Sequence, residues 1–268
     1  KDTDGDGKAD QWAINDLSYN GAPASWWHHE TGWALIRTFG GDTYSANMSE
    51  TRISSPQTVA ALQYVADLLN KHKVAARAEN VAGLGDPWRV GTTAMSGFPH
   101  ASLGFFLRYE KRPIKNYGVE YLPQAARGGR KQAVVGTTGF AIPSKSGSPR
   151  EAWQYLKWAT GEYVGTKVQQ HWRWGSNRKN LLDLRFRDQE AKGISIEQNW
   201  ERVLVRPFFP ERTDIALGYP MAPAGLLEIE SILDTQFDPV WLGRRTAEQA
   251  AKDAQPQIDA VLAKYYRK

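Results

Sequence analysis

Four aspartates near the start of the chain have the spacing of a calcium-binding loop. They fall at ligand positions 1, 3, 5 and 9 of such a loop and are Asp2, Asp4, Asp6 and Asp10. Gly7 stands where the loop turns sharply, and the backbone carbonyl of Lys8 stands at ligand position 7. The last position, where a bidentate glutamate completes the loop, is Ala13, so we expect weaker Ca²⁺ binding than in a complete loop. The alternative is a solvated turn without metal.

A second feature that could serve ligand binding is the large number of aromatic residues. The chain has 11 Trp, 11 Tyr and 9 Phe in 268 residues, although its mean hydropathy of -0.56 is not that of an especially apolar protein. Sugars stack their C–H faces on indole rings while their hydroxyls take hydrogen bonds. We therefore expect some of these rings to line a wet ligand cleft. The competing interpretation is that most of them lie in the core.

Motifs for catalysis are absent from the sequence. It contains no HExxH, P-loop, GxSxG or Rossmann glycine fingerprint. The absence of cysteine excludes disulfides, thiolate metal sites and cysteine nucleophiles. A glycosidase, the main alternative, needs two carboxylates that flank the scissile bond, and Glu30 has no convincing partner in the sequence. We expect a binding protein that requires no cofactor rather than an enzyme.

Charge and hydropathy limit the other classes. The 34 Lys and Arg against 29 Asp and Glu leave a net charge of +5, and the basic residues are spread along the chain. A pI near 9.3 and the segment WRWGSNRK are weak evidence for an anionic polymer, so we expect no nucleic-acid partner. No run approaches the ~18 apolar residues of a membrane span, and no signal-peptide pattern opens the sequence. The sequence predicts a soluble chain.

Helix signals are clearest after Ser54-Ser55, where a capping serine precedes Pro56 and apolar residues follow at helical spacing. This pattern predicts a helix over Pro56–His72. Trp153 and Trp158 belong to an amphipathic segment and are expected to pack in its helix interface. The other predicted helices are Ser25–Phe39, a short one at Asp86–Arg89, Pro149–Ala159, Glu162–Trp172, Leu226–Phe237 and Ala247–Tyr265.

Short apolar runs bounded by Gly and Pro predict strands between the helices. They are Trp12–Leu17, Thr92–Met95, Tyr117–Leu122 and Val134–Pro143. The polar segment Gln124–Gln132 is rich in Gly and Arg and is expected to be a loop. Strands alternate with helices over the first two thirds of the chain, so the sequence favours an α/β architecture.

Eight phrases, in order along the chain, carry a resemblance to a known family. They are DTDGDGKADQW, GWALIRTFGG, SPQTVAALQYVADLL, WRVGTTAMSG, NYGVEYLP, VVGTTGFAIPSKS, EAWQYLKWAT and RRTAEQAAKDAQPQIDAVL. Together they resemble the family 1 extracellular solute-binding proteins, which include the maltose-binding components of ABC importers. Each phrase alone is weak, and the order and spacing across nearly the whole chain make the combination specific.

The resemblance implies a type II periplasmic-binding-protein-like fold without the family's N-terminal segment. By this analogy, most of the chain builds the C-terminal lobe, and one part returns to the N-terminal lobe. The implied division is 1–132 for the C-terminal lobe, 133–186 for the return segment and 187–268 for helices that pack on the C-terminal lobe. Residues 133–186 would then lack their natural sheet partners.

The function implied by the resemblance is capture of a carbohydrate or polyol-like solute between two lobes, whose closure an ABC transporter reads. The implied partners are the ligand and the permease subunits. The implied location is periplasmic or extracellular, with membrane contact only through the transporter or a lipid anchor outside this chain.

The resemblance also assigns ligand residues to two segments of the first hundred residues. Trp26 and Trp27 precede the GWALIRTFGG phrase, where one or the other would stack on a pyranose. The polar residues beside them that would bond its hydroxyls are His28, His29 and Glu30. Phe98 and His100 follow the AMSG phrase in a turn that faces the cleft in the family. Sugar binders often have Trp where this chain has His100, which puts a plain maltodextrin specificity in doubt.

Three later segments complete the expected site. Thr137 and Thr138 lie between glycines at the lobe crossing, where small residues let a ligand approach closely, although they also suit a plain hinge strand. Trp174 and Arg178 precede a loop that lies near the cleft in the family. Tyr219 lies in a loop where related proteins contribute another aromatic ring.

Overall fold

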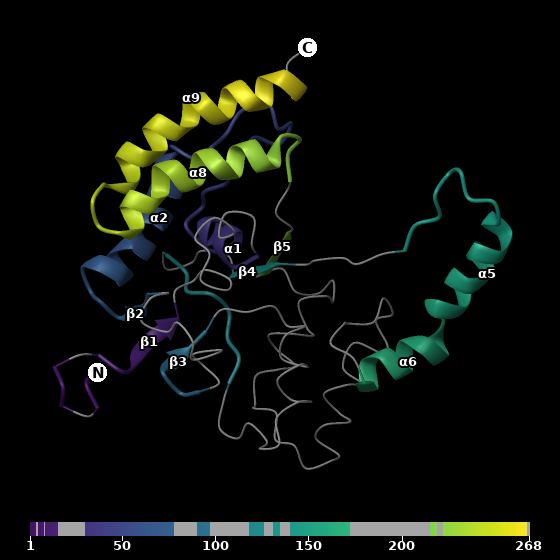
Figure 1. Ribbon diagram of the computed structural model, residues 1–268, viewed down its shortest axis with the longest axis horizontal. Helices are drawn as coiled ribbons and strands as arrows, with labels where there is room; N and C mark the ends of the chain where they lie inside the picture. Colours follow the sequence, from purple (N-terminus) through teal and green to yellow (C-terminus); the bar gives the residue numbers. More distant parts are fainter. Residues whose placement is uncertain are drawn as a thin grey trace. The chain divides into compact units, whose positions relative to one another are not determined.

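The computed structural model describes residues 1–3, 5–7, 9–15, 30–77, 90–96, 118–125, 131–134, 140–171, 215–218 and 222–266 (Figure 1). The chain divides into two compact units. Unit 1 comprises Lys1–Gly97, Leu122–Val134 and Gly218–Lys268, and unit 2 comprises Phe98–Tyr121 and Val135–Leu217. None of the helices in the described ranges combines the length and apolar character that a membrane crossing needs.

Unit 1 contains a three-stranded parallel sheet. Its strands are β1 (Trp12–Asn15), β2 (Ala75–Ala76) and β3 (Thr93–Met95), in the order β2-β1-β3. Ile14 in the central strand is aligned with Ala75, and it packs partly buried against the hydrophobic core. Because both pairings are parallel, the carboxyl ends of all three strands lie at one edge of the sheet.

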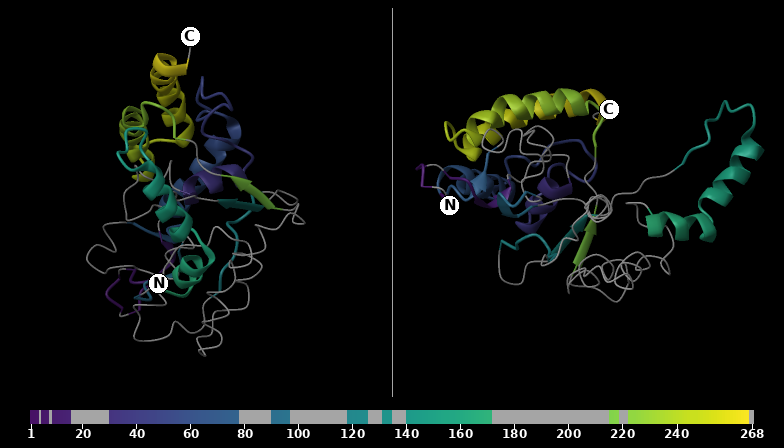
Figure 2. Two further views of the ribbon diagram at one scale, coloured as in Figure 1. Left: turned by 90° about the vertical axis from the view of Figure 1, so that its right-hand side faces the viewer. Right: turned by 60° about the horizontal axis from the view of Figure 1, so that its bottom comes forward.

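Four helices of unit 1 form the layer that encloses its core. They are α1 (Glu30–Thr38), α2 (Pro56–Asn70), α8 (Leu226–Trp241) and α9 (Ala247–Tyr266). Helices α8 and α9 lie side by side in both views of the unit, and α2 contacts both of them (Figures 1 and 2). Helix α1 packs on α2.

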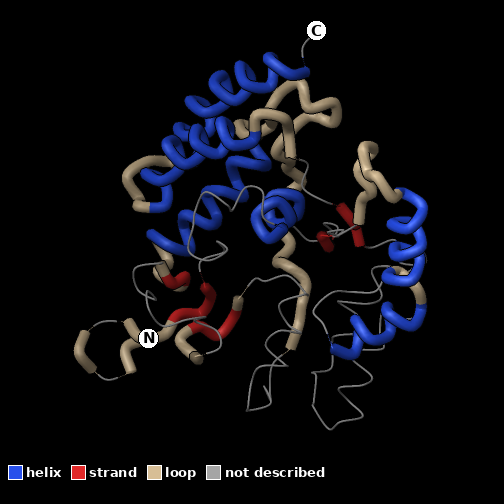
Figure 3. Tube along the Cα trace, turned by 45° about the vertical axis from the view of Figure 1, so that its right-hand side comes forward, coloured by secondary structure: helices blue, strands red, loops and turns tan. Residues whose placement is uncertain are grey.

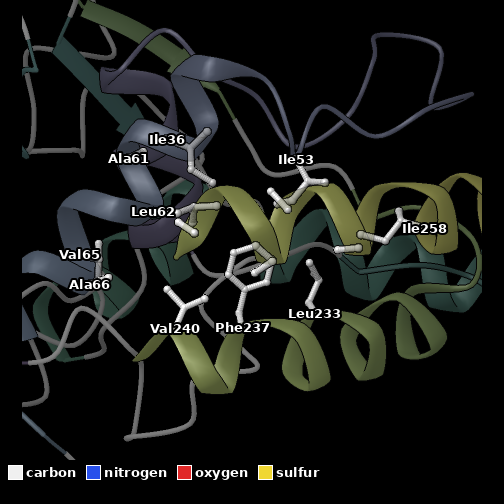
Figure 4. Close-up of a cluster of buried hydrophobic side chains, with 14 of the residues drawn as sticks. Ile36, Ile53, Ala61, Leu62, Val65, Ala66, Leu233, Phe237, Val240 and Ile258 are labelled. Atoms are coloured by element: carbon white, nitrogen blue, oxygen red, sulfur yellow. The ribbon is translucent and has the colours of Figure 1, made fainter. Parts of the chain in front are cut away.

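The core lies where α2, α8 and α9 meet (Figure 4). Phe237 and Val240 of α8 are fully buried together with Leu62 of α2 and Ile258 of α9. Burying a side chain of this kind contributes roughly 1.5–3 kcal/mol. Apolar residues three and four positions apart therefore stabilise α2, α8 and α9 by tertiary packing.

Hydrogen bonds between distant parts of the chain fasten the same layer. The amide of Thr51 donates to a carboxylate oxygen of Asp259 at 2.7 Å. The amide of Ala247 donates to the side-chain oxygen of Gln63 at 3.1 Å. The start of α9 is therefore bonded to the middle of α2, and its second half to the segment before α2.

Helices α5 (Pro149–Ala159) and α6 (Glu162–His171) belong to unit 2 and contact each other (Figure 3). No residue of α5 is buried. Trp153 and Trp158 are 56% and 58% exposed. The prediction that these two rings pack in a helix interface is therefore wrong, because both side chains are more than half exposed.

Strands β4 (Lys131–Val134) and β5 (Ile215–Gly218) form a separate two-stranded sheet. The sequence predicted a loop over the first two residues of β4, a strand only from Val134 onward, and no strand at β5. The pairing partners are about 80 residues apart, and neither segment has a clear strand pattern on its own.

Two predicted strands are wrong over most of the parts that the structure describes, although Val134, the first residue of one of them, lies in β4. Residues 118–122 form no strand, and the side chain of Glu120 accepts the amide of Tyr121 at 2.9 Å, which occupies a donor that a strand ladder would use. Residues 140–143 form no strand either. There the amide of Ser146 donates to the carbonyl of Pro143 at 3.0 Å, so the chain turns.

The sequence did not predict β2, a strand of two residues. The remaining described elements confirm the predicted ones, and the mixed helix and sheet content confirms the α/β class. Helix α8 continues four residues beyond the predicted end, through Pro239. Proline lacks the amide of a helix interior, yet Val240 beyond it is fully buried and the rings of Phe237 and Trp241 pack at 6.1 Å. Tertiary packing therefore outweighs the local stop signal. The predicted helix at 86–89 lies outside the described residues, and the division at 132 and 186 stays a prediction.

Candidate functional site

Most of the residues predicted to bind a ligand lie outside the described ranges. Glu30 is the first residue of α1. The other predicted ligand residues are outside the described ranges: Trp26, Trp27, His28, His29, Phe98, His100, Thr137, Thr138, Trp174, Arg178 and Tyr219. Their roles stay predictions, and the structure describes the elements beside them in sequence.

The described elements beside two of the predicted segments share one edge of the sheet. Strand β1 ends at Asn15 and α1 begins at Glu30, so residues 16–29 connect the carboxyl end of β1 to the start of α1. Phe98 follows the end of β3 by three residues. Because β1 and β3 are parallel neighbours, both segments leave from the carboxyl edge, which is where open α/β sheets place their ligands.

The N-terminal loop is closed by its own hydrogen bonds. The carboxylate of Asp2 accepts the amides of Gly5 at 2.6 Å and Gly7 at 3.0 Å. The carboxylate of Asp10 accepts both the amide and the hydroxyl of Thr3, at 2.7 and 2.6 Å. Gly5 and Gly7 both have φ of 84°, a conformation that favours glycine. These bonds explain the turn at the glycines.

Calcium binding by this loop is not tested by these bonds. In the described part of the chain, no group of three or more acidic or histidine side chains is placed to hold a metal. Asp4 and Lys8, two of the five predicted ligands, lie outside that part. The predicted site therefore stays a prediction.

A pocket of about 350 Å³ lies between the end of α2 and the turn from α8 to α9. Sequence reasoning did not find it, because its walls come from segments at least 170 residues apart. Its lining groups already bond each other: Gln63 donates to Asp67 at 2.8 Å, and Asn70 donates to the carbonyl of Val240 at 3.0 Å. The lining contains no aromatic residue. The pocket is therefore a hydrogen-bonded seam between helices, and it lacks the stacking platform that a sugar site uses.

Two carboxyl groups with raised pKa values, Asp234 and Glu230, lie on α8. Burial first, and then the charge of Asp238, raises the pKa of Asp234. Burial and then the charge of Asp234 raise the pKa of Glu230. These acids stand four residues apart along one face of the helix, and neither lines the pocket described above. Their shifts reflect burial first and then the like charges beside them on the helix.

The comparison with protein families decides the classification. Residues 6–164, more than half of the chain, match the family described as bacterial extracellular solute-binding protein. The chain belongs to this family. The match includes the second half of the N-terminal loop, the three-stranded sheet, α2 and α5. No curated protein matches the chain.

Solved structures of solute-binding proteins have the same fold. The ABC substrate-binding protein Lmo0181 of Listeria monocytogenes, in complex with cycloalternan, matches with a TM-score of 0.67 and 16% identity, over 96% of this chain and 60% of its own. A solute-binding protein of Thermotoga lettingae bound to α-D-tagatose matches with a TM-score of 0.67 and 19% identity, over 94% of this chain and 60% of its own. UgpB of Mycobacterium tuberculosis, in complex with glycerophosphocholine, matches with a TM-score of 0.65 and 15% identity, over 97% of this chain and 60% of its own.

The chain therefore has the type II periplasmic-binding-protein-like α/β fold, as predicted, and spans about 60% of the length of these three structures. The family is one of extracellular binding proteins.

Proposed function

We propose that this chain acts in an extracytoplasmic solute-binding protein that captures a carbohydrate or polyol-like solute for an ABC importer. Membership of the extracellular solute-binding family over residues 6–164 is the observation that carries this proposal. The likeness to solved proteins bound to an oligosaccharide, a sugar and a glycerol phosphodiester supports the class of ligand.

In this proposal, the ligand binds at the carboxyl edge of the sheet in unit 1. Trp26 and Trp27 stack on the ligand, and His28, His29 and Glu30 bond its hydroxyls. Phe98 and His100 extend the same site. The other expected contacts come from Thr137, Thr138, Trp174, Arg178 and Tyr219. Two lobes close around the ligand, and the permease subunits recognise the closed form, which the ligand favours by binding it more tightly than the open form.

A thermal-shift titration of the natural protein tests the proposal. The probes are cycloalternan, α-D-tagatose and glycerophosphocholine, followed by a panel of sugars and polyols. A ligand at 100 times its dissociation constant stabilises the folded state by about 2.7 kcal/mol. The proposal is wrong if no sugar or polyol raises the melting temperature. Parallel scattering measurements with ligand are expected to show a smaller radius of gyration when the lobes close.

A matched pair of histidine variants tests the placement of the site. His100→Ala is expected to weaken binding about tenfold through the loss of one hydrogen bond to the ligand. The control is His72→Ala, which removes an exposed histidine at the end of α2 and should leave affinity unchanged. Equal affinities for both variants would remove His100 from the site.

A glycosidase is the enzymatic alternative. An activity assay on the same protein distinguishes it from a binding protein. Hydrolysis needs two carboxylates on either side of the scissile bond. Incubation with the oligosaccharides that bind is expected to leave them intact. Release of shorter sugars at a rate that falls with Glu30→Gln would favour the enzyme.

We also propose that the N-terminal loop binds Ca²⁺ with Asp2, Asp4, Asp6, the carbonyl of Lys8 and Asp10. Oxygen ligands at this spacing suit a hard cation. Calorimetric titration with CaCl₂ is expected to give a weak signal that Asp6→Ala abolishes, while Asp253→Ala on α9 leaves it intact. If the titration gives no heat of binding, the loop is a turn closed only by its own hydrogen bonds.

A further inference from the structure

The fold gathers basic residues that are far apart in the sequence onto one surface of unit 1. The end of α2 meets the turn from α8 to α9 there, and a Cβ added at Gly243 in that turn would lie 3.2 Å from the side chain of Asn70. The guanidinium of Arg77 joins the same segments, because it donates to Oδ1 of Asn70 at 2.6 Å and to the carbonyl of Trp241 at 3.3 Å. We call the basic residues of these segments the basic patch: Lys71, Lys73, Arg77, Arg244 and Arg245.

Acidic side chains offset only part of the charge of the basic patch. Arg245 forms an ion pair with Asp253 of α9. Lys71, Lys73 and Arg244 are exposed, and none of them belongs to an ion pair with a residue that the structure describes. The acids on the adjoining parts of α2, α8 and α9 that pair with no lysine are Asp67, Asp238 and Asp253. Five cations against three acids leave a positive surface, which attracts an anionic partner.

The pocket of about 350 Å³ between α2 and the α8–α9 turn is lined by both arginines of that turn. Two donors in its described lining bond to no described residue, namely the guanidinium of Arg244 and Nε2 of Gln249. The side-chain oxygen of Gln249 is already used by the amide and hydroxyl of Thr246. Asp67, the acidic residue of the described lining, accepts Nε2 of Gln63 at 2.8 Å. The pocket therefore offers donors to an oxygen ligand, and a carboxylate is a strong acceptor for an arginine.

The basic patch lies at the opposite edge of the sheet from the proposed solute site. Helix α2 ends at Asn70 and β2 begins at Ala75, so residues 71–74 lead into the amino end of β2. Because β2 is parallel to β1, this end lies opposite the carboxyl edge from which residues 16–29 leave. A partner that binds the basic patch therefore leaves the solute edge open.

We propose that the basic patch and its pocket bind an acidic segment of a partner protein, with one carboxylate bonded to Arg244 and Gln249 and others beside Lys71 and Lys73. A carboxylate on a flexible side chain reaches into a pocket between helices, whereas a flat bilayer surface spans its mouth. A single phosphate ion would leave the exposed lysines without a counter-charge. This inference uses the geometry of unit 1 and does not depend on the proposed function.

Fluorescence anisotropy of the natural protein with fluorescein-labelled hexaglutamate at physiological salt tests the proposal. We expect saturable binding that Arg244→Ala weakens about tenfold, through loss of a charge-assisted hydrogen bond. The matched control is Lys252→Ala, which removes the same charge from an exposed lysine of α9 that pairs with Glu248 and should leave affinity unchanged. Absence of binding would overturn the proposal. An equal loss in both variants would also overturn it, because net charge alone would then explain the attraction.

Gln249→Glu tests the pocket itself. The substitution keeps the oxygen that accepts the bonds from Thr246 and replaces the donor nitrogen by an acceptor, so it should weaken hexaglutamate binding at least as much as Arg244→Ala. Unchanged affinity would remove the pocket from the proposed surface.

Two further probes separate the competing ligands. Phosphatidylglycerol vesicles in a cosedimentation assay test an anionic membrane, and an equal concentration of inorganic phosphate tests a small anion as a competitor of hexaglutamate. Tighter binding to the vesicles than to the peptide, or displacement of the peptide by phosphate, would overturn the proposal. The rise in melting temperature caused by a sugar or polyol should be the same in Arg244→Ala as in the unsubstituted protein, so a failure here is distinguishable from a failure of the proposed function.

Discussion

Helices α2 and α5 begin in the same way and end in different surroundings. Each starts with a serine before a proline, Ser55-Pro56 and Ser148-Pro149, and each has apolar residues at helical spacing. Six residues of α2 are buried, whereas none of α5 is. Local sequence therefore specifies both helices, and burial depends on whether other polypeptide covers the apolar face.

The largest expected difference in the free energy of unfolding is between deleting a buried ring in the core of unit 1 and deleting an exposed ring in α5. Phe237→Ala in α8 should lower the free energy of unfolding by about 3–5 kcal/mol, because the ring is fully buried. Trp158→Ala in α5 removes a larger ring and should cost less than about 0.5 kcal/mol in the 268-residue chain, because that ring is exposed. Denaturant unfolding followed by circular dichroism measures both.

The control for this pair is Leu227→Ala. Leu227 is 80% exposed on the same helix as Phe237, so its substitution should change stability as little as Trp158→Ala does. A large loss for Trp158→Ala would break the comparison, because it would mean that α5 is covered in this chain.

A pair of glycines gives the next largest difference. Gly225, before α8, has φ of 81°, and a Cβ there would lie 2.7 Å from Val261 and 2.9 Å from Tyr265. Gly225→Ala should therefore cost about 1–3 kcal/mol through strain and overlap. A Cβ added at Gly147, before α5, would meet nothing within 4 Å, and Gly147→Ala should change stability by less than about 0.5 kcal/mol. Thermal melting of both variants checks the contrast, and a similar loss in both would refute it.

Helix caps offer a smaller and more local test. The hydroxyl of Ser55 accepts the amide of Thr58 at 3.3 Å, so Ser55→Ala should destabilise by about 1 kcal/mol. Ser148 makes no side-chain cap bond, so Ser148→Ala should be close to neutral. Equilibrium unfolding in urea measures the two differences. A cost at Ser148 as large as that at Ser55 would show that the cap of α5 forms in solution.

The smallest expected effect on the free energy of unfolding is electrostatic, and it has opposite signs for a carboxyl in α8 and a carboxyl in α5. The pKa of Asp234 is raised in the folded state, so the folded protein holds the proton more tightly than the unfolded chain, and unfolding free energy falls as pH rises through this titration. Asp234→Asn should therefore stabilise by about 0.2–0.5 kcal/mol at neutral pH, with no gain in strong acid. Glu151→Gln should destabilise slightly, since Glu151 lies in the first turn of α5. Urea unfolding at pH 3 and pH 7 measures both, and a loss at Asp234 would contradict the assignment.

Prediction from sequence succeeded where the signal was local. The Ser-Pro start placed α2, the amphipathic pattern placed α5, and the spacing of alanine and other apolar residues placed α9. It failed for β4, because a strand next to Gly and Arg is recognised only through its partner β5, and that partner is about 80 residues away. It also misjudged Trp153 and Trp158, since amphipathic spacing reports which face is apolar and does not report what covers it.

The candidate site was accessible to sequence reasoning only through the resemblance. Composition indicated aromatic rings in a cleft, and the spacing of the aspartates indicated calcium. Neither shows which rings converge, because Trp26, His100 and Trp174 are far apart in sequence. The sheet order β2-β1-β3 adds what the sequence lacked, namely that the segments after β1 and β3 leave from the same edge.

The bonds from Thr51 to Asp259 and from Gln63 to Ala247 have a consequence for biogenesis. Their partners are 208 and 184 residues apart. At about 5–20 residues per second of synthesis, the apolar side of α2 waits about 10–40 s before the last two helices emerge to cover it. Unit 1 is therefore expected to assemble only after α8 and α9 have been synthesised, and α2 is the element that a chaperone would need to hold until then.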